Sequence, residues 1–223
     1  MSLLAVCALE QLHTLTVVAR GLWWNEDSDV DEEDMSSDDE DIDTDEEWDR
    51  FEHGLASLQL TSLSMVYTAV PPALPDTLRR LSIKSPWMGT EGGDGRVPRD
   101  FALLGALTRL THLKLSRTDA DASGKPVDLA PLASLANLER FILKNSPRPS
   151  LVPLEGLTRL TGLSLKGMYS ADGPGVDIPD GLAAMTTLKS LNLSEIVDLA
   201  GSREYFAGMG THTVCELTKT TFM

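Results

Sequence analysis

Few residues of this sequence combine the types and the spacing that catalysis or cofactor binding requires. The glycine-rich stretch GTEGGDGR at residues 89–96 lacks the Gly-Lys-Ser/Thr sequence of a phosphate-binding loop and does not lead from a strand into a helix. Gly124 and Lys125 precede a proline, which favours a loop. His212 and Cys215 could be two metal ligands, but a structural zinc site has four. We therefore predict no catalytic residues, no cofactor and no metal site, and thus no enzyme.

Negative charge is concentrated in one stretch, residues 25–49. It contains sixteen Asp and Glu residues and no Lys or Arg; since the whole chain has a net charge of −15, the remainder has a net charge of +1. Such a block repels itself and buries little apolar surface, so we expect a disordered insertion. Hydroxyl residues followed three positions later by an acidic residue suit acid-directed kinases. The candidate phosphorylation sites of this kind are Ser28, Ser36, Ser37 and Thr44.

Composition also limits the cellular setting. The two cysteines, Cys7 and Cys215, are too few for a disulfide framework. The N-terminal stretch MSLLAVCALEQLHTL has no basic region and no signal-peptide cleavage site. No apolar run approaches the ~20 residues that span a bilayer. We therefore predict a cytoplasmic protein without a membrane partner.

An internal repeat supplies the elements that would position the remaining polar side chains. Four copies have apolar residues at the same offsets: Leu104, Leu107, Leu110, Leu113 and Leu115; Leu132, Leu135, Leu138, Phe141 and Leu143; Leu154, Leu157, Leu160, Leu163 and Leu165; Leu182, Met185, Leu188, Leu191 and Leu193. Weaker copies precede them, at Val6, Leu9, Leu12, Leu15 and Val17, at Leu60, Leu63 and Met65, and at Leu78, Leu81 and Ile83. The closing L-x-L alternates as in a strand, and the threefold spacing before it suits a 3₁₀ turn. Stacked units of this kind bury a continuous core that one unit cannot.

The pattern resembles the leucine-rich repeat family, in an intracellular form with irregular repeats. The resemblance covers Val6 to Leu193 apart from the insertion. It implies an α/β solenoid: a curved right-handed arc with a parallel β-sheet on the concave face and short helices or 3₁₀ turns on the convex side. We predict strands of one sheet near residues 14–17, 62–65, 80–83, 112–115, 140–143, 162–165 and 190–193.

Four segments follow from this interpretation. Residues 1–24 form a first repeat without a cap, residues 25–49 the acidic insertion, and residues 50–199 the remaining repeats. Residues 200–223 are an irregular tail or a degenerate last repeat, with a strand near Val214 and Leu217 in the second case. The uncapped ends indicate either part of a longer protein or contacts with a partner.

One departure from the family concerns the turns. The family places an asparagine three residues after the last leucine of each strand, where its side chain satisfies backbone groups of the neighbouring turn. The corresponding residues here are Thr118, Ser146, Met168 and Ile196. Threonine and serine can make part of these hydrogen bonds and methionine and isoleucine cannot, so we expect no asparagine ladder and irregular turns.

The concave face carries the candidate binding residues. Alternate side chains of a strand point to opposite sides, so the residues between the buried leucines face outward. Six of the 21 such positions are Lys or Arg and none is acidic, although acidic residues outnumber basic ones in the chain. Either they are ordinary solvent-facing residues or they bind a partner. The candidates for partner binding are Arg80, Lys84, His112, Lys114, Arg140, Lys144, Lys166 and Asn192.

The resemblance implies a non-catalytic protein–protein interaction module that recognises a partner through the concave face. The charges favour an acidic partner at this face and a basic one at the insertion, unless the insertion itself folds over the face and masks it. The alternative is an acidic leucine-rich regulatory phosphoprotein that binds basic, histone-like partners. Nucleic acid is not an expected partner. Members of the family also suggest the ciliary axoneme or cytoskeleton, and the nucleus, as alternative locations.

Overall fold

The structure is a computed structural model of the 223-residue chain. It describes residues 12–18, 50–51, 53–66, 71–84, 101–116, 128–147, 149–168, 185–195 and 214–216. The acidic segment 25–49 lies outside these residues, together with its four candidate phosphorylation sites. The glycine-rich stretch 89–96, residues 124–125 and His212 lie outside them as well.

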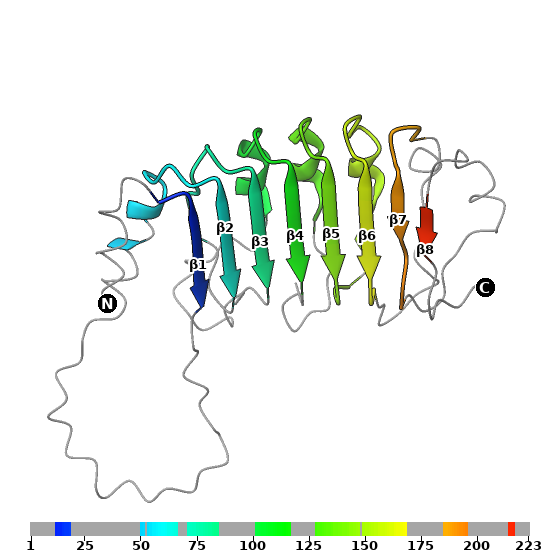
Figure 1. The fold of residues 1–223 in the computed structure, drawn as a ribbon, viewed down its shortest axis with the longest axis horizontal. Coiled ribbons are helices and arrows are strands. Elements are labelled where there is room, and N and C mark those ends of the chain that lie inside the picture. The colour runs from blue at the N-terminus through cyan, green and yellow to red at the C-terminus, as the bar shows by residue number, and fades with distance from the viewer. Residues whose placement is uncertain are drawn as a thin grey trace, which may run out of the picture.

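One parallel sheet runs through the described chain (Figure 1). Its strands are β1 (Thr14–Val18), β2 (Ser62–Val66), β3 (Arg80–Lys84), β4 (His112–Ser116), β5 (Arg140–Lys144), β6 (Gly162–Lys166), β7 (Ser190–Asn192) and β8 (Val214–Glu216). Each strand pairs in parallel with the next one in the chain. The seven predicted strands and their single sheet are thus confirmed, and β8 is the strand considered for the C-terminal tail.

The core forms because the same apolar offsets meet in every repeat. The first buried position of each strand pairs with its equivalent in the next, as in Leu81 with Leu113 and Leu113 with Phe141. The leucines at threefold spacing before the strands, such as Leu104 and Leu107, belong to the same buried cluster. Burying these side chains in every repeat removes apolar surface from water along the whole sheet, which is the main stabilising contribution.

Short 3₁₀ helices carry the leucines that face the sheet. They are η2 (Phe101–Ala106), η3 (Ala130–Ser134) and η4 (Val152–Leu154), and they follow one another along the sheet (Figure 1). Pro131 and Pro153 stand in the first turns of η3 and η4, where a fixed φ favours a helical start. Leu132 and Leu154 in these turns are fully buried. The predicted 3₁₀ turns are therefore present in three successive repeats.

A helical turn at residues 50–51 and 53–55 precedes β2 and was not expected. Phe51 and Leu55 in this turn are both 0% exposed and belong to the main core. Because these two side chains pack at the β1–β2 end of the molecule, they anchor the chain at the point where the acidic segment returns to the fold.

The edge at which the strands begin is held by a regular set of backbone hydrogen bonds. The residue before each strand from β1 to β6 accepts two N–H groups from the next repeat. The Thr111 carbonyl, for example, accepts the N–H of Glu139 at 2.9 Å and that of Arg140 at 3.0 Å. Threonine hydroxyls reinforce the pattern, as when Thr161 Oγ1 donates to the Glu139 carbonyl at 3.1 Å. These bonds fix the register of the side chains that follow.

The turns after β5, β6 and β7, which the structure describes, are more regular than predicted. Asn145, Gly167 and Glu195 occupy the same place in three successive repeats, and all have positive φ, of 48°, 63° and 57°. The N–H of Asn145 donates to the Lys166 carbonyl at 2.8 Å, and that of Gly167 to the Ser194 carbonyl at 3.0 Å. The ladder thus continues one residue beyond the strand, and this shared left-handed residue makes the turns alike.

Two of the four residues that replace the family's asparagine are described. Ser146 is fully buried, and its Oγ donates to the carbonyl of Lys144 at 3.2 Å, as expected for a partial substitute. Met168 is 1% exposed and packs in the core. The other two, Thr118 and Ile196, lie outside the described residues.

Candidate protein-binding face

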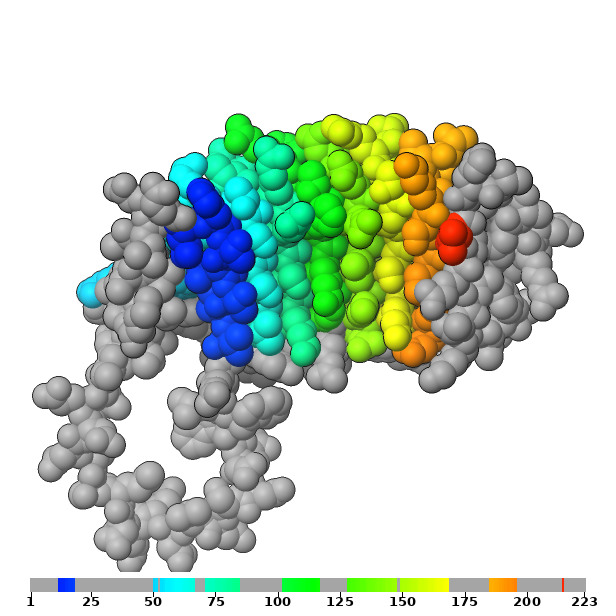
Figure 2. Space-filling model, in the orientation of Figure 1, coloured from blue at the N-terminus to red at the C-terminus, as the bar shows by residue number. Residues whose placement is uncertain are grey.

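The open face of the sheet consists of three rows of side chains that cross the strands at right angles. In the row nearest the strand starts, Arg80 pairs with His112, and His112 with Arg140. In the last row, Lys144 pairs with Lys166. Figure 2 shows the strands that carry these rows as adjacent bands of colour on one side of the molecule. Arg80, His112 and Arg140 thus share one row, and Lys84, Lys144 and Lys166 share another, with Ser116 between Lys84 and Lys144.

The last row is interrupted. Ser116 lies between Lys84 and Lys144 in the register, and it is only 6% exposed. Its Oγ is buried and has no hydrogen-bond partner among the described residues. Ser194, expected on the same face, is 3% exposed and is also buried. The expectation that alternate positions of the strands face outward is therefore wrong for both serines, which are buried although Ser116 is still paired within β4.

The cations of this face differ in how they are compensated. No hydrogen bond or ion pair joins the side chains of Arg80, Lys114, Arg140 and Lys144 to the part of the chain that the structure describes. Lys166 Nζ lies 3.3 Å from Glu195 Oε1, and the two side chains are each 40% exposed. The charge of Lys166 is therefore partly neutralised within the fold, whereas the other four cations have no such partner among the described residues.

The middle row ends in polar residues. Lys114 is followed across the sheet by Ile142, Ser164 and Asn192. The side chain of Asn192 is engaged with its own strand end, because its Oδ1 accepts the N–H of Ser194 at 3.1 Å. Glu216 of β8 stands next to Asn192 in the register and is the first acidic residue of this row. The basic part of the face is thus confined to β3–β6.

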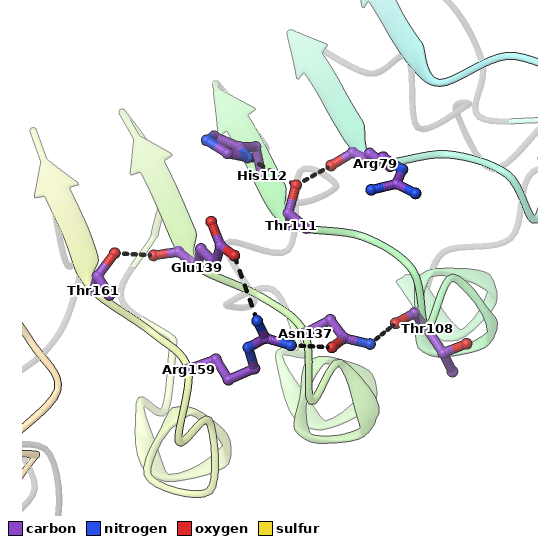
Figure 3. Close-up of polar contacts among 8 residues, drawn as sticks. All are labelled: Arg79, Thr108, Thr111, His112, Asn137, Glu139, Arg159 and Thr161. Atoms are coloured by element: carbon purple, nitrogen blue, oxygen red, sulfur yellow. Dashed lines mark hydrogen bonds and ion pairs between the residues drawn. The ribbon is translucent and has the colours of Figure 1, made fainter.

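His112 is held in a defined orientation by a hydrogen-bonded chain (Figure 3). Thr111 Oγ1 donates to the carbonyl of Arg79 at 2.9 Å, so it can only accept from His112 Nδ1, which lies 2.9 Å away. The neutral imidazole therefore carries its proton on Nδ1 and leaves Nε2 as an acceptor. Partial burial lowers the pKa of His112, the charges of Arg80 and Arg140 lower it further, and Glu139 raises it.

A second polar network lies at the edge where the strands begin, and it is not among the predicted sites. Arg159 Nη1 donates to Asn137 Oδ1 at 2.9 Å, and Asn137 Nδ2 donates to the carbonyl of Thr108 at 2.9 Å (Figure 3). Arg159 Nη2 lies 4.0 Å from Glu139 Oε1. Asn137 lies three residues before β5, and Arg159 lies three residues before β6. Polar residues at this same offset in successive repeats are the sequence signal that could have indicated the network.

These observations together decide the type of fold: one strand per repeat, a constant register, a continuous leucine core and 3₁₀ turns along the sheet. The fold is a leucine-rich repeat solenoid. No protein-family model matches the chain, and a search of curated proteins gives no significant match.

Among solved structures, the chain is similar to internalin C2 of Listeria monocytogenes, with 18% sequence identity and a TM-score of 0.49 over 78% of this chain and 67% of that one. It is also similar to a second internalin of that organism, inlF, with 17% identity and a TM-score of 0.45 over 76% of this chain. The match spans about half of that second protein, 52% of its chain.

Within the described ranges, no three His, Cys, Asp or Glu side chains are grouped as metal ligands would be. In the same ranges, the solenoid contains no helix of the length and apolarity that crossing a bilayer demands.

Proposed function

We propose that the chain is a non-catalytic protein-interaction module whose open sheet face binds an acidic segment of a partner protein. One observation supports this most directly: Arg80, Lys114, Arg140 and Lys144 project from adjacent strands without an ion pair to the described residues. The sheet fixes their backbone positions, so little backbone conformational entropy remains to be lost on binding. Parallel strands ~4.8 Å apart bring the charges close enough to act together on one anionic ligand.

We propose further that the acidic segment 25–49 competes for this face. The chain leaves β1 at Val18, which lies in the same row as Val66 and Lys84, and it returns at the helical turn that contains Phe51. A chain of 25 residues extends to at most ~80 Å, so a loop tethered at both ends reaches ~40 Å. The strands from β1 to β5 span about four spacings, or ~19 Å. The segment is therefore long enough to reach Lys144.

The expected competition is weak and reversible. Exposed ion pairs contribute only ~0.2–1 kcal/mol each, so no single contact would hold the segment on the face. Several pairs formed by a tethered segment act together because its effective concentration is high. Salt should weaken the contact, since the Debye length falls from ~10 Å at 0.1 M to ~3 Å at 1 M. A charged partner could then displace the segment.

The test compares the intact chain with a variant whose residues 25–49 are replaced by a Gly/Ser linker of equal length. We expect a polyglutamate peptide to bind the linker variant more tightly at low salt. Charge reversal at Lys84, Lys144 and Lys166 should remove the difference. The matched control reverses three exposed edge cations, Arg79, Arg109 and Lys189, and should change binding less than twofold. All variants are first compared by circular dichroism.

The outcomes separate the two parts of the proposal. Equal binding by the intact chain and the linker variant would contradict masking. Absence of peptide binding by both at low salt would contradict the proposed acidic partner. Binding of a histone by the intact chain, lost in the linker variant, would instead support the regulatory phosphoprotein that binds basic partners.

A further inference from the structure

We propose that Arg80, His112 and Arg140 form a binding site for a phosphate group on an acidic peptide, and that His112 makes this site respond to pH. The proposal rests on the proposed function of the open face and names the chemistry of one subsite within it. The three residues, termed here the Arg-His-Arg row, occupy equivalent positions on β3, β4 and β5.

The geometry provides three sets of donors along one line. The backbones of Arg80 and Arg140 are two strand spacings apart, or about 9.6 Å, with His112 between them. Guanidinium groups bind phosphate through paired N–H donors. A phosphate monoester offers three terminal oxygens, enough for two guanidinium groups and an imidazolium, whereas a carboxylate offers two. The row therefore suits a phosphorylated side chain better than an Asp or Glu of the same peptide.

Both arginines can move onto such a ligand without losing a polar contact. Neither guanidinium forms a hydrogen bond or ion pair with the described residues. The stem of Arg140 lies over Gly162, since its Cγ is 3.5 Å from the place that a Cβ of this glycine would occupy. Only van der Waals contact holds the stem there, so the guanidinium can turn toward His112.

His112 supplies a donor whose presence depends on its charge. Its Nδ1–H is used by Thr111, so the neutral ring presents only the Nε2 acceptor to a ligand. Protonation converts Nε2 into a donor and adds a positive charge between Arg80 and Arg140. In the free protein, partial burial and the two arginines keep the pKa of His112 below its usual value. A bound phosphate offsets the arginine charges and therefore raises that pKa.

The sign of the pH effect follows from this difference. Because the pKa of His112 is higher in the complex than in the free protein, binding takes up a proton and becomes tighter as the pH falls. The gain begins as the pH falls through the pKa of the complex and is complete below that of the free protein. The other charged groups nearby are Arg79 and Glu139 at the strand starts and Lys114 on β4 itself. Glu139 opposes an anion, although Arg159 compensates part of its charge.

The experiment uses the intact chain and a synthetic peptide of residues 25–49, phosphorylated at Ser36 and Ser37 or unmodified. We expect the phosphorylated peptide to bind at least fivefold more tightly at pH 5.5 to the wild type than to His112→Gln. At pH 7.5 the two proteins should differ less than twofold. Comparing the proteins at the same pH cancels the protonation of the phosphate itself, whose second pKa is ≈ 6. Glu139→Gln should bind more tightly than the wild type at both pH values.

A second measurement reports on the imidazole directly. The NMR signals of the His112 ring, titrated with and without the phosphopeptide, should show a pKa that is higher in the complex. The double variant Arg80→Gln/Arg140→Gln should lose the preference for the phosphorylated peptide, whereas Arg109→Gln at the sheet edge should keep it. An unchanged His112 titration, or equal binding of the two peptides, would overturn the inference. In that case the proposed function of the open face can still hold without this subsite. It would be supported if both peptides bind the wild type and if charge reversal at Lys84, Lys144 and Lys166 abolishes their binding.

Discussion

The same left-handed backbone conformation follows three successive strands. It is adopted by Asn145 after β5, by Gly167 after β6 and by Glu195, three residues after β7. Only glycine adopts such φ values without strain, and asparagine tolerates them better than most residues. Glu195 is the least suited of the three, and its carboxylate is also the partner of Lys166. The position of Glu195 in the repeat thus fixes the backbone of the residue whose side chain forms the ion pair with Lys166.

The first prediction concerns Gly167. A Cβ at this position would meet Oδ1 of Asn145 at a distance that no relaxed contact allows, and the φ of 63° disfavours a side chain in any case. We expect Gly167→Ala to lower the free energy of unfolding by roughly 1–2 kcal/mol. The control is Gly156→Ala, where a new Cβ would have nothing within 4 Å. Urea unfolding of both variants checks this, and equal midpoints would contradict it.

The second prediction concerns the pH dependence of stability. The folded-state pKa of His112 lies below that of the unfolded chain, so the unfolded chain takes up this proton more readily. His112 therefore contributes a loss of stability as the pH falls through the unfolded value of ~6.5 toward the folded one. We expect His112→Gln to show a smaller loss between pH 7.5 and 5.5 than the wild type in urea unfolding. Parallel pH profiles for the two proteins would argue against it.

At the scale of the elements, the spacing of the leucines predicted the sheet well. Buried residues recur every second position in a strand and every third position in a 3₁₀ turn, so the two elements can be told apart in the sequence. The same threefold spacing extends one step before the predicted offsets, to Leu129 and Leu151, which are both 2% exposed. The helical turn with Phe51 and Leu55 was missed because it follows the acidic segment and has no copy among the other repeats as far as the structure describes them.

The candidate face was only partly predictable for a physical reason. Alternation along a strand tells which side chains leave the core, and it grouped Arg80, His112 and Arg140 correctly. It does not tell how exposed such a side chain is, and Ser116 at the end of β4 and Ser194 after β7 are both buried. Alternation also does not tell which cation forms an ion pair with a residue of the next repeat, as Lys166 does with Glu195.

The third prediction tests the contribution of the 3₁₀ turns. Leu132 in η3 is fully buried between the sheet and neighbouring turns. We expect Leu132→Ala to destabilise the chain by ~2–5 kcal/mol, since the removed atoms leave a cavity. The control, Val152→Ala in η4, changes a side chain that is 58% exposed and should stay within ~0.5 kcal/mol of the wild type. Thermal or urea unfolding would measure both, and similar losses would show that η3 does not support the core.

At the scale of the whole molecule, charge is divided between the open face and a single segment. The chain outside residues 25–49 has a net charge of +1 against sixteen acidic residues within them. The strand-end edge is also the edge where the chain leaves β1, β3, β4 and β6 for its longest connections. The solenoid can therefore keep its core unchanged while the charge of one connection varies.

The fourth prediction concerns such variation. We expect Ser28, Ser36, Ser37 and Thr44 to carry phosphate in protein isolated from its native cells, each adding about −1.5 to −2 charge at neutral pH. Mass spectrometry checks this site by site. Ser57 serves as the control, because a leucine stands three residues after it. Complete coverage of the segment without phosphate at any of the four residues would refute the prediction.

The pairing of each strand only with its neighbours in the chain also determines how the molecule responds to force. A load applied to the two ends meets β1 and β8 first, and each can peel away without disturbing the strands further in. Extension would then advance in steps set by the spacing of equivalent strand starts, such as the 28 residues from His112 to Arg140 and the 22 from Arg140 to Gly162. These steps release roughly 95 Å and 75 Å of chain. We therefore expect the solenoid to unfold under force one repeat at a time from the two edges of the sheet, and a partner bound across β3–β5 would hold the middle repeats together.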